Sequence, residues 1–229
     1  MSKIWVTSDP HFNHQNILKY EPVTRPFETV EEMNKALISN WNNVVDKDDI
    51  VYVCGDLCMG QIEDARKCVR QLNGRIILVR GNHDTANRIA LYKELGIEVK
   101  DIEYLSYKGR FFILCHFPIA NEEFIKMVRK DNSEVVNLYG HIHSNAPKGY
   151  VDGTYHVGVD TNDLTPVSLD QIWKECWPEE IMTEPIQEYK TKHSKCDKCV
   201  YELDCTKDLY DDNGHCGKYK RDAKDGGLY

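Results

Sequence analysis

The sequence predicts an α/β layered fold for residues 1–177, because short apolar runs alternate with segments of helical periodicity. Five runs rich in β-branched and aromatic residues are bounded by Gly, Asp or Asn, which is typical of buried strands. They cover residues 3–8, 49–54, 75–79, 110–115 and 134–139. Folds of this class carry functional residues on the loops beyond the carboxyl ends of strands. We therefore expect the polar residues that follow these runs to form the functional site.

Three helices are expected between the strands, over residues 29–44, 61–72 and 85–95. Thr29 and Glu32 have the spacing of a capping box at the start of the first helix. Apolar residues three or four apart then follow along one face of it: Val30, Met33, Leu37, Trp41 and Val44. The second and third helices end before Gly74 and Gly96, because glycine commonly terminates helices.

The chain has 229 residues, with 29 Lys and Arg against 37 Asp and Glu, which gives a formal net charge of −8. This balance provides no overall positive field, so nucleic acid is a partner that local patches would allow but the net charge does not indicate. No basic, apolar leader precedes the first strand, and no run is long and apolar enough to span a bilayer. We expect a cytoplasmic protein without a membrane partner, and the sequence leaves its protein partners open.

Five short polar segments lie at or after the ends of the predicted strands. In order they are Asp9-Pro10-His11, Gly55-Asp56, Gly81-Asn82-His83-Asp84, His116 and Gly140-His141-Ile142-His143. Carboxylate oxygen, amide oxygen and imidazole nitrogen are the groups that hold hard and borderline divalent cations. Two ions that share one ligand need about seven such groups. Together the segments supply a full ligand set for two metal ions.

Strand geometry predicts how these groups converge. Alternate residues of a strand share a face, so Asp9 and His11 are expected to project to the same side, as are His141 and His143. Asp56 lies where one carboxylate would bridge two ions about 3.5–4 Å apart. Each segment alone is also compatible with an ordinary turn or a solvated strand edge. A degenerate, metal-free protein is the alternative for the whole set.

At these residues the chain resembles the calcineurin-like metallophosphoesterases, whose five blocks read D-x-H, G-D, G-N-H-D/E, H and G-H-x-H. Residues 4–169 also look like a branch of small bacterial and phage members, whose first block extends to D-x-H-F-x-H-x-N-I, here Asp9 to Ile17. The resemblance implies two sheets packed face to face with helices outside. It also implies one metal ion held by Asp9, His11, Asp56 and His143, and a second held by Asp56, Asn82, His116 and His141.

The resemblance further implies that His83 is a catalytic residue that does not bind metal. It would protonate the leaving oxygen or stabilise its charge, a role that suits an imidazole near neutral pH. Water activated by the two ions would attack phosphorus in line, without a covalent phospho-enzyme. Asp84 would orient His83 or shape its loop, and the alternative is that Asp84 is the N-cap of the helix that begins near Thr85.

Substrate contacts are less clearly marked. His14 and Arg25 are candidates to meet a phosphate, because imidazole is a switchable donor and guanidinium offers two parallel donors. A surface or structural role is the alternative for both residues. His156 is expected to be a strand residue near Asp160 without a ligand role.

The predicted function is therefore that of a dinuclear metal-dependent phosphoesterase, with a nucleotide-like or other small phosphodiester as the substrate. The alternatives are a phosphomonoesterase or protein phosphatase, and a nuclease aided by the cysteines near the C-terminus. A non-catalytic scaffold is disfavoured, because it would not need an intact ligand set. The mixed nitrogen and oxygen ligands accept manganese, iron, zinc, nickel or cobalt, of which manganese is favoured.

Composition changes after Trp177. Residues 178–190, rich in Glu and with two prolines, are expected to be a linker, and residues 191–229 a small Cys-rich module. The module contains Cys196, Cys199, Cys205 and Cys216. Their C-x2-C-x5-C-x10-C spacing predicts a structural zinc site, with His193 or His215 able to replace one thiolate. An iron–sulfur cluster and a disordered tail with free thiols are the alternatives. The remaining cysteines are expected to be small buried residues: Cys54, Cys58, Cys68, Cys115 and Cys176.

Overall fold

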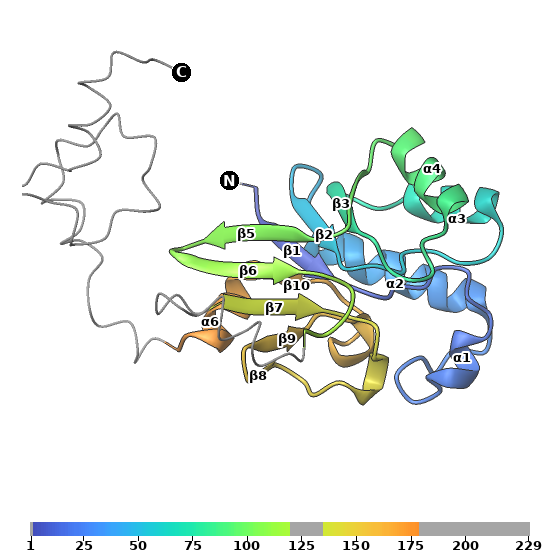
Figure 1. Cartoon of the computed structure of the whole chain (residues 1–229). Helices are drawn as coiled ribbons and strands as arrows, with labels where there is room; N and C mark the ends of the chain where they lie inside the picture. The colour runs from blue at the N-terminus through green and yellow to red at the C-terminus, as the bar shows by residue number, and fades with distance from the viewer. Residues whose placement is uncertain (1, 120–134, 179–229) are drawn as a thin grey trace, which may run out of the picture. The chain divides into compact units, whose positions relative to one another are not determined.

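The computed structural model describes residues 2–119 and 135–178, which form two five-stranded sheets packed face to face (Figure 1). The first sheet has the strand order β10-β1-β2-β3-β4. Its strands are β1 (Ile4–Thr7), β2 (Ile50–Val53), β3 (Arg75–Val79), β4 (Glu98–Lys100) and β10 (Val167–Ser168). Strands β1 to β4 run parallel to one another, and β10 pairs antiparallel with β1.

The second sheet has the order β5-β6-β7-β9-β8 and is mixed. Its strands are β5 (Glu103–Tyr107), β6 (Arg110–Leu114), β7 (Val135–Tyr139), β8 (Tyr150–Val151) and β9 (Thr154–His156). The three central strands β6, β7 and β9 are parallel, whereas β5 and β8 pair antiparallel with their neighbours at the edges. The carboxyl ends of the parallel strands therefore share one edge in each sheet.

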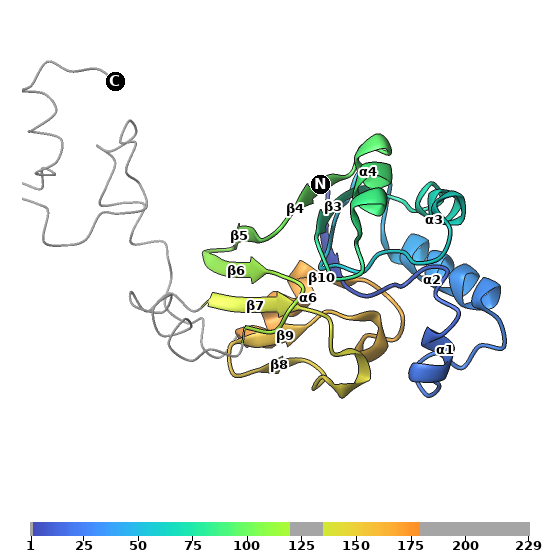
Figure 2. The ribbon, with the colours of Figure 1, turned by 45° about the vertical axis from the view of Figure 1, so that its right-hand side comes forward.

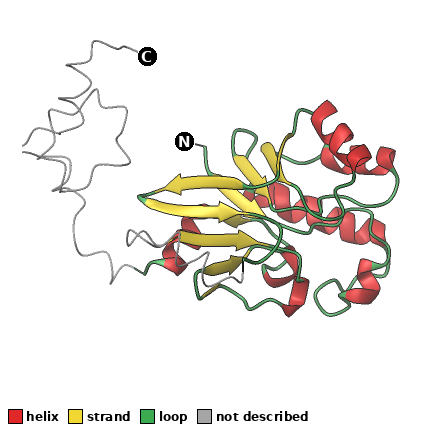
Figure 3. Ribbon diagram, in the orientation of Figure 1, coloured by secondary structure: helices red, strands yellow, loops and turns green. Residues whose placement is uncertain are grey.

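Helices cover the outer face of the first sheet. They are α2 (Val30–Val44), α3 (Ile62–Val69) and α4 (Ala86–Glu94), which Figure 2 shows on the side away from β5, β6 and β7. The shorter α1 (Ile17–Tyr20) follows β1, and α6 (Leu169–Cys176) follows β10. Figure 3 shows α2, α3 and α4 gathered beside the strands rather than between the two sheets. The described helices include none with the length and apolar character needed to cross a bilayer.

The first sheet separates two apolar cores. Along β2, Val51 and Val53 lie in the core with the helices, whereas Tyr52 and the next residue after the strand, Cys54, lie in the core shared with the second sheet. Successive strand residues point to opposite faces, and here both faces are covered. This double burial explains why β1, β2 and β3 are nearly continuous apolar runs rather than alternating patterns.

The start of α2 forms only half of the predicted capping box. The Thr29 side chain accepts a hydrogen bond from the Glu32 amide at 3.2 Å. The Glu32 carboxylate accepts from the Glu28 amide, also at 3.2 Å, instead of from the Thr29 amide. The predicted apolar face is confirmed, since all five of its residues are buried or packed against the helix-side core.

Within the described residues, all five predicted strands are confirmed with ends that differ by at most one residue. The helix predicted over residues 61–72 is shorter, because its last residues form a tighter turn in which the Leu72 amide donates to Val69 O at 3.1 Å. The five cysteines before residue 178 are buried, as expected. Except for Pro178, the predicted linker and the Cys-rich module lie outside the described residues.

Candidate metal centre

Loops that follow the strands of the first sheet are joined by backbone hydrogen bonds. The Asp9 amide donates to Gly55 O and the His11 amide to Asp56 O, both at 3.1 Å. The buried Asp84 carboxylate links two further segments, since it accepts from the Asp56 amide at 2.8 Å and the Gly81 amide at 2.9 Å. Asp84 therefore shapes the loops around the site.

The alternative role of Asp84 as a helix N-cap is wrong. The N-cap of α4 is Thr85, whose side chain makes no capping hydrogen bond. Asp84 faces the loop interior instead, where the Tyr92 hydroxyl also donates to it at 3.4 Å. This side-chain donor ties the loop after β3 to helix α4.

Backbone conformation, rather than strand alternation, aims the polar side chains. β1 ends at Thr7, before the Asp-x-His segment, so the expectation that alternate strand residues share a face does not apply there. Five residues of the site have positive φ: Asp9 (56°), His11 (50°), Asp56 (55°), His141 (71°) and His143 (50°). Asp, Asn and His are the non-glycine residue types that adopt this left-handed region most readily. Each such residue turns the chain sharply and directs its side chain into the space beyond the strands.

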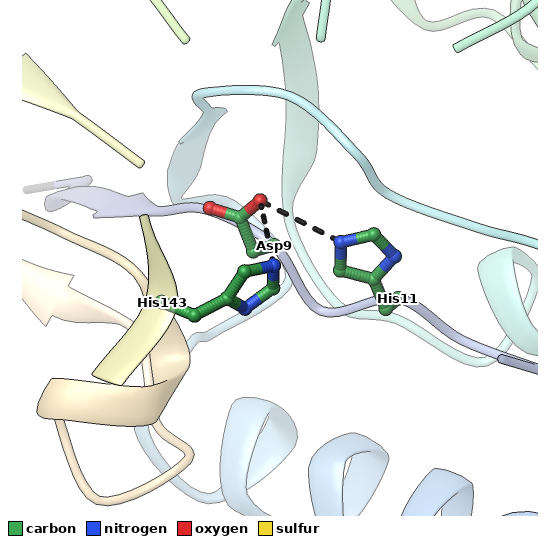
Figure 4. A group of neighbouring side chains, drawn as sticks. All are labelled: Asp9, His11 and His143. Carbon is green, nitrogen blue, oxygen red and sulfur yellow. Dashed lines mark ion pairs between the residues drawn. The ribbon is translucent and has the colours of Figure 1, made fainter. Parts of the chain in front are cut away.

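Asp9, His11 and His143 form one half of the cluster (Figure 4). The same Asp9 oxygen, Oδ1, lies 3.6 Å from His11 Nε2 and 3.9 Å from His143 Nε2. The other oxygen, Oδ2, accepts a hydrogen bond from the His141 amide at 2.8 Å and lies 2.7 Å from Ser8 Oγ. Protein donors thus hold Oδ2 and leave Oδ1 directed at the two imidazoles.

Asp56 joins this half to a second one. Its Oδ2 lies 3.6 Å from His11 Nε2 and 3.4 Å from His116 Nε2. His116 Nε2 is in turn 2.8 Å from Asn82 Oδ1, which lies 3.1 Å from His141 Nδ1. All seven predicted ligand residues therefore form one continuous cluster, with the Asp56 carboxylate at its centre.

Hydrogen bonds at the far side of two imidazoles set which nitrogen faces the cluster. His116 Nδ1 lies 2.8 Å from the Cys54 carbonyl oxygen, and His143 Nδ1 lies 2.7 Å from Asp160 Oδ2. Such partners fix the tautomer and ring orientation of a metal-binding histidine and leave its Nε2 lone pair free. Asp160 was not predicted as a site residue. The sequence feature that could have identified Asp160 is its position shortly after β9, because the other site residues also follow strands.

Arg25 lies behind the cluster, which corrects the prediction that it meets a phosphate. Its side chain is fully buried and donates to both Asp160 oxygens, at 2.7 and 2.9 Å. The guanidinium also donates to the backbone oxygens of Asp9 and Pro10. The structural alternative is therefore correct, and Arg25 supports the loop after β1 and the carboxylate that orients His143.

The donor set fits a divalent cation. Asp9 Oδ1 and His11 Nε2 are buried and have no hydrogen-bond partner. Burial of unpaired polar atoms destabilises the folded state unless a bound group interacts with them. Both atoms face the same space as His143 Nε2 and Asp56 Oδ2. A cation held by these atoms would satisfy the two orphaned groups.

The charges in the cluster suit metal binding at neutral pH. Burial would raise the pKa of Asp9, but the interaction of its carboxylate with the adjacent His11 imidazole outweighs burial and holds that pKa well below its usual range. Burial lowers the pKa of His11 to about 4. Burial also raises the pKa of Asp56 to about 6, with His116 opposing and Asp9 adding to the shift. An ionised carboxylate beside a neutral imidazole is the state that a metal ligand set requires.

His83 and His14 lie next to the cluster but outside the ligand set. His83 Nε2 is 4.0 Å from Asp56 Oδ2, and 45% of the His83 side chain is exposed. His14 Nδ1 lies 3.2 Å from His11 Nδ1, and its ring centroid is 6.4 Å from that of His83. Burial, followed by the charges of His83 and Arg25, lowers the pKa of His14. His156 is a buried residue of β9, as expected, with Nδ1 2.7 Å from Thr161 Oγ1.

The sequence profile of the calcineurin-like phosphoesterase superfamily domain matches residues 3–157, which include every residue of this cluster. The chain belongs to the calcineurin-like phosphoesterase superfamily. As a member of this metallophosphoesterase family it is a hydrolase that acts on phosphoric ester bonds, and the family implies divalent metal ions at the site.

Relatives of this calcineurin-like phosphoesterase extend over most of its length. An uncharacterized protein of Methanocaldococcus jannaschii is 40% identical over 186 residues, which cover 76% of this chain and 91% of that protein. The Gene 66 protein of Mycobacterium phage L5 is 28% identical over 199 residues, covering 76% and 93% of the two chains. The solved structure of a protein of unknown function from Aquifex aeolicus has a TM-score of 0.63 and 27% identity, and covers 76% of this chain and 99% of that one.

Proposed function

We propose that the protein is a dinuclear metal-dependent phosphodiesterase. One ion is held by Asp9, His11, Asp56 and His143, and the other by Asp56, Asn82, His116 and His141. The observation that carries this proposal is the position of Asp56 Oδ2, which both His11 Nε2 and His116 Nε2 approach, at 3.6 and 3.4 Å. These imidazoles come from different sheets, and a shared anionic ligand offsets the repulsion between two cations.

When bound, two divalent ions supply Lewis acidity toward phosphoryl oxygens and lower the pKa of water toward neutrality. Manganese is the favoured metal, with iron, zinc, nickel and cobalt as alternatives. The residues of the chain supply orientation and proton transfer. His83 is half exposed at the edge of the cluster, and its backbone amide donates to Asp56 Oδ1 at 2.8 Å. We assign His83 as the general acid that donates a proton to the leaving oxygen.

The burial of Arg25 against Asp160 supports a diester rather than a monoester substrate. A phosphate monoester carries up to two negative charges and is usually held by free cationic side chains, whereas a diester carries one. Arg25 and Arg88 both act electrostatically on His14. Arg25 is buried against Asp160, and the terminal nitrogens of Arg88 donate to Thr85 Oγ1 and Gly60 O. Arg25 is therefore not free to pair with a second phosphate charge.

Hydrolysis of two chromogenic esters tests the proposal. The full chain, supplied with manganese, is expected to hydrolyse bis-p-nitrophenyl phosphate with a higher kcat/KM than p-nitrophenyl phosphate. The His83→Ala variant should lose about 10²- to 10⁴-fold in kcat on the diester while keeping both ions, because loss of a general acid costs about that much. Metal content by mass spectrometry separates this effect from loss of metal.

The Asp56→Asn variant provides the contrasting control. Removal of the shared charge should abolish both metal binding and hydrolysis. Preference for the monoester would move the substrate class to phosphomonoesters. Loss of metal in His83→Ala would contradict the role assigned to His83.

A further inference from the structure

Phe117 is an exposed aromatic residue in contact with one half of the candidate metal centre. Its side chain is 51% exposed, although phenylalanine is costly to leave in water. The ring centroid lies 4.6 Å from that of His141 and 5.0 Å from that of His116, with interplanar angles of 62° and 75°. Two edge-on contacts with proposed metal ligands hold the ring beside the site and leave part of it open to solvent.

Tyr20 is a second exposed aromatic residue, and it belongs to the other half. Its ring is 67% exposed and lies 6.2 Å from His14, which lies 5.0 Å from His11. His83 belongs to this same half, 5.5 Å from His11 by ring centroids. The proposed general acid and Tyr20 therefore contact the His11 side of the cluster, whereas Phe117 contacts the His116 and His141 side.

The different surroundings of the two halves indicate which side of the site each ester group of a phosphodiester occupies. If His83 protonates the leaving oxygen, the leaving group lies on the side of His83, His14 and Tyr20. The attacking water then takes the position in line with the leaving group, and the retained group is an equatorial substituent of phosphorus that extends toward Phe117. We propose that Phe117 binds this retained group by stacking, and that the substrate is a phosphodiester whose retained group is a planar ring of the nucleobase class. The inference rests on the proposed function, because it uses the role of His83 and a diester substrate.

Stacking explains why a half-exposed phenylalanine is useful at this position. Every nucleobase has a flat face, so an aromatic side chain binds it with little dependence on sequence and adds to affinity by burial and ring contact. A phenylalanine ring already held by two imidazoles loses little conformational freedom when a base stacks on it. A purely structural ring that supports His116 and His141 is the competing explanation, and the two make different predictions.

Two esters with the same leaving group separate these explanations. Thymidine 5′-(p-nitrophenyl phosphate) and methyl p-nitrophenyl phosphate both release p-nitrophenol, but only the first retains a base. The manganese-loaded full chain is expected to favour the thymidine ester by about tenfold or more in kcat/KM. Phe117→Ala and Phe117→Leu should reduce this ratio by about tenfold while leaving kcat/KM for the methyl ester close to that of the wild type. Phe117→Trp should restore the ratio.

Tyr104→Ala is the matched control, because Tyr104 is 66% exposed on β5 and makes no ring contact with the site histidines in the described structure. It should leave both rates unchanged. Equal losses on the two esters in Phe117→Ala would overturn the inference and assign the ring a structural role. A wild type that does not discriminate between the esters would overturn it as well. Failure of the wild type on both diesters, with activity on p-nitrophenyl phosphate, would instead refute the proposed function.

Discussion

Asp160 connects a buried charge to a proposed metal ligand. Its carboxylate accepts from His143 Nδ1 at 2.7 Å and pairs with the fully buried Arg25. Burial opposes ionisation of Asp160, but the Arg25 and His143 partners outweigh it and hold the pKa of Asp160 well below its usual range. Asp160 therefore stays ionised, and it raises the pKa of His143 against the effect of burial. An ionised partner makes the imidazole a stronger ligand.

Asp160→Asn is expected to weaken binding of the ion held by His143 by about 10- to 100-fold, as loss of such a partner usually does. It should also destabilise the fold by about 3–5 kcal/mol, because Arg25 keeps a buried charge without its carboxylate. Calorimetric manganese titration and thermal unfolding measure the two effects. Asp163→Asn is the control, since Asp163 pairs with Lys148 on the surface and should change little. Two ions bound as tightly as in the wild type would contradict this role.

Gly140 lies where any side chain would collide with the cluster. A Cβ atom there would be 1.9 Å from Ser8 Oγ and 2.2 Å from Asp9 Oδ2. Gly140→Ala is therefore expected to displace Asp9, lower bound metal, and destabilise the protein by about 1–3 kcal/mol. Gly96→Ala, with open space around it but a φ of +82°, should lower stability without changing metal content. Equal metal content in both variants would count against the geometry described for Asp9.

At the scale of elements, the strands that carry the site could be predicted and those at the edges could not. β1, β2 and β3 are buried on both faces, so their apolar runs are unambiguous. β5 alternates between partly buried and exposed residues, and β8 and β10 have only two residues each. Such short or half-exposed segments carry little periodic signal. The two-sheet arrangement came from resemblance to a family, because periodicity does not report how sheets pack.

The proposed ligands were predicted from their residue types and order in the sequence, but the residues that hold them in position were not. Motif spacing identified the proposed ligands, since their chemistry is visible in the sequence. The Arg25–Asp160 pair joins residues 135 positions apart, a distance at which no local pattern exists. The left-handed backbone conformation at the ligand positions was also not predicted. Strand alternation predicts the convergence of the side chains and requires no left-handed residue.

The turn that starts β2 is held by one buried carboxylate. Asp49 accepts hydrogen bonds from the Lys3 amide (2.7 Å), the Trp5 indole (2.8 Å) and the Asp46 amide (3.0 Å). Burial alone would raise the pKa of Asp49, but these donors outweigh it and lower the pKa. The ionised form is thus favoured in the folded state, which stabilises β1 against β2 above the ordinary carboxyl pKa.

Asp49→Asn is expected to lower the free energy of unfolding by about 1–3 kcal/mol at pH 7, because the amide group meets a donor where an acceptor is required. The difference from the wild type should shrink as the pH falls below about 4 through the lowered pKa, where the wild-type carboxylate also becomes protonated. Urea unfolding at pH 7, 4 and 3 measures this difference in the free energy of unfolding, with the exposed Asp48→Asn variant as the control. A difference that stays constant across this range would refute the assignment.

At the scale of the molecule, the site depends on both sheets. Asp9, Asp56 and Asn82 follow strands of the first sheet, whereas His116, His141 and His143 follow strands of the second. The apolar core between the sheets therefore fixes the relative positions of the ligands. A change in sheet packing would separate the two ligand groups, so stability of the whole domain and metal binding are coupled.

The cysteines near the C-terminus are predicted to bind a zinc ion independent of the active site. The full chain should contain one zinc per molecule beyond the two ions proposed for the active site. The double variant Cys196→Ser, Cys199→Ser is expected to lose this zinc and retain hydrolysis of bis-p-nitrophenyl phosphate. Metal analysis of the purified chain distinguishes the outcomes, and iron with visible absorbance would favour the iron–sulfur alternative instead.

The positive φ angles of the proposed ligands have a consequence for evolution. Each left-handed non-glycine residue costs the fold of order 1 kcal/mol or more, and five of the seven proposed ligands carry this cost. Glycine would relieve it at every one of these positions. Selection for heat resistance alone would therefore favour glycine at these positions, and the resulting protein would lose its metal ligands and its activity. Selection for catalysis must act continuously at these positions to keep them.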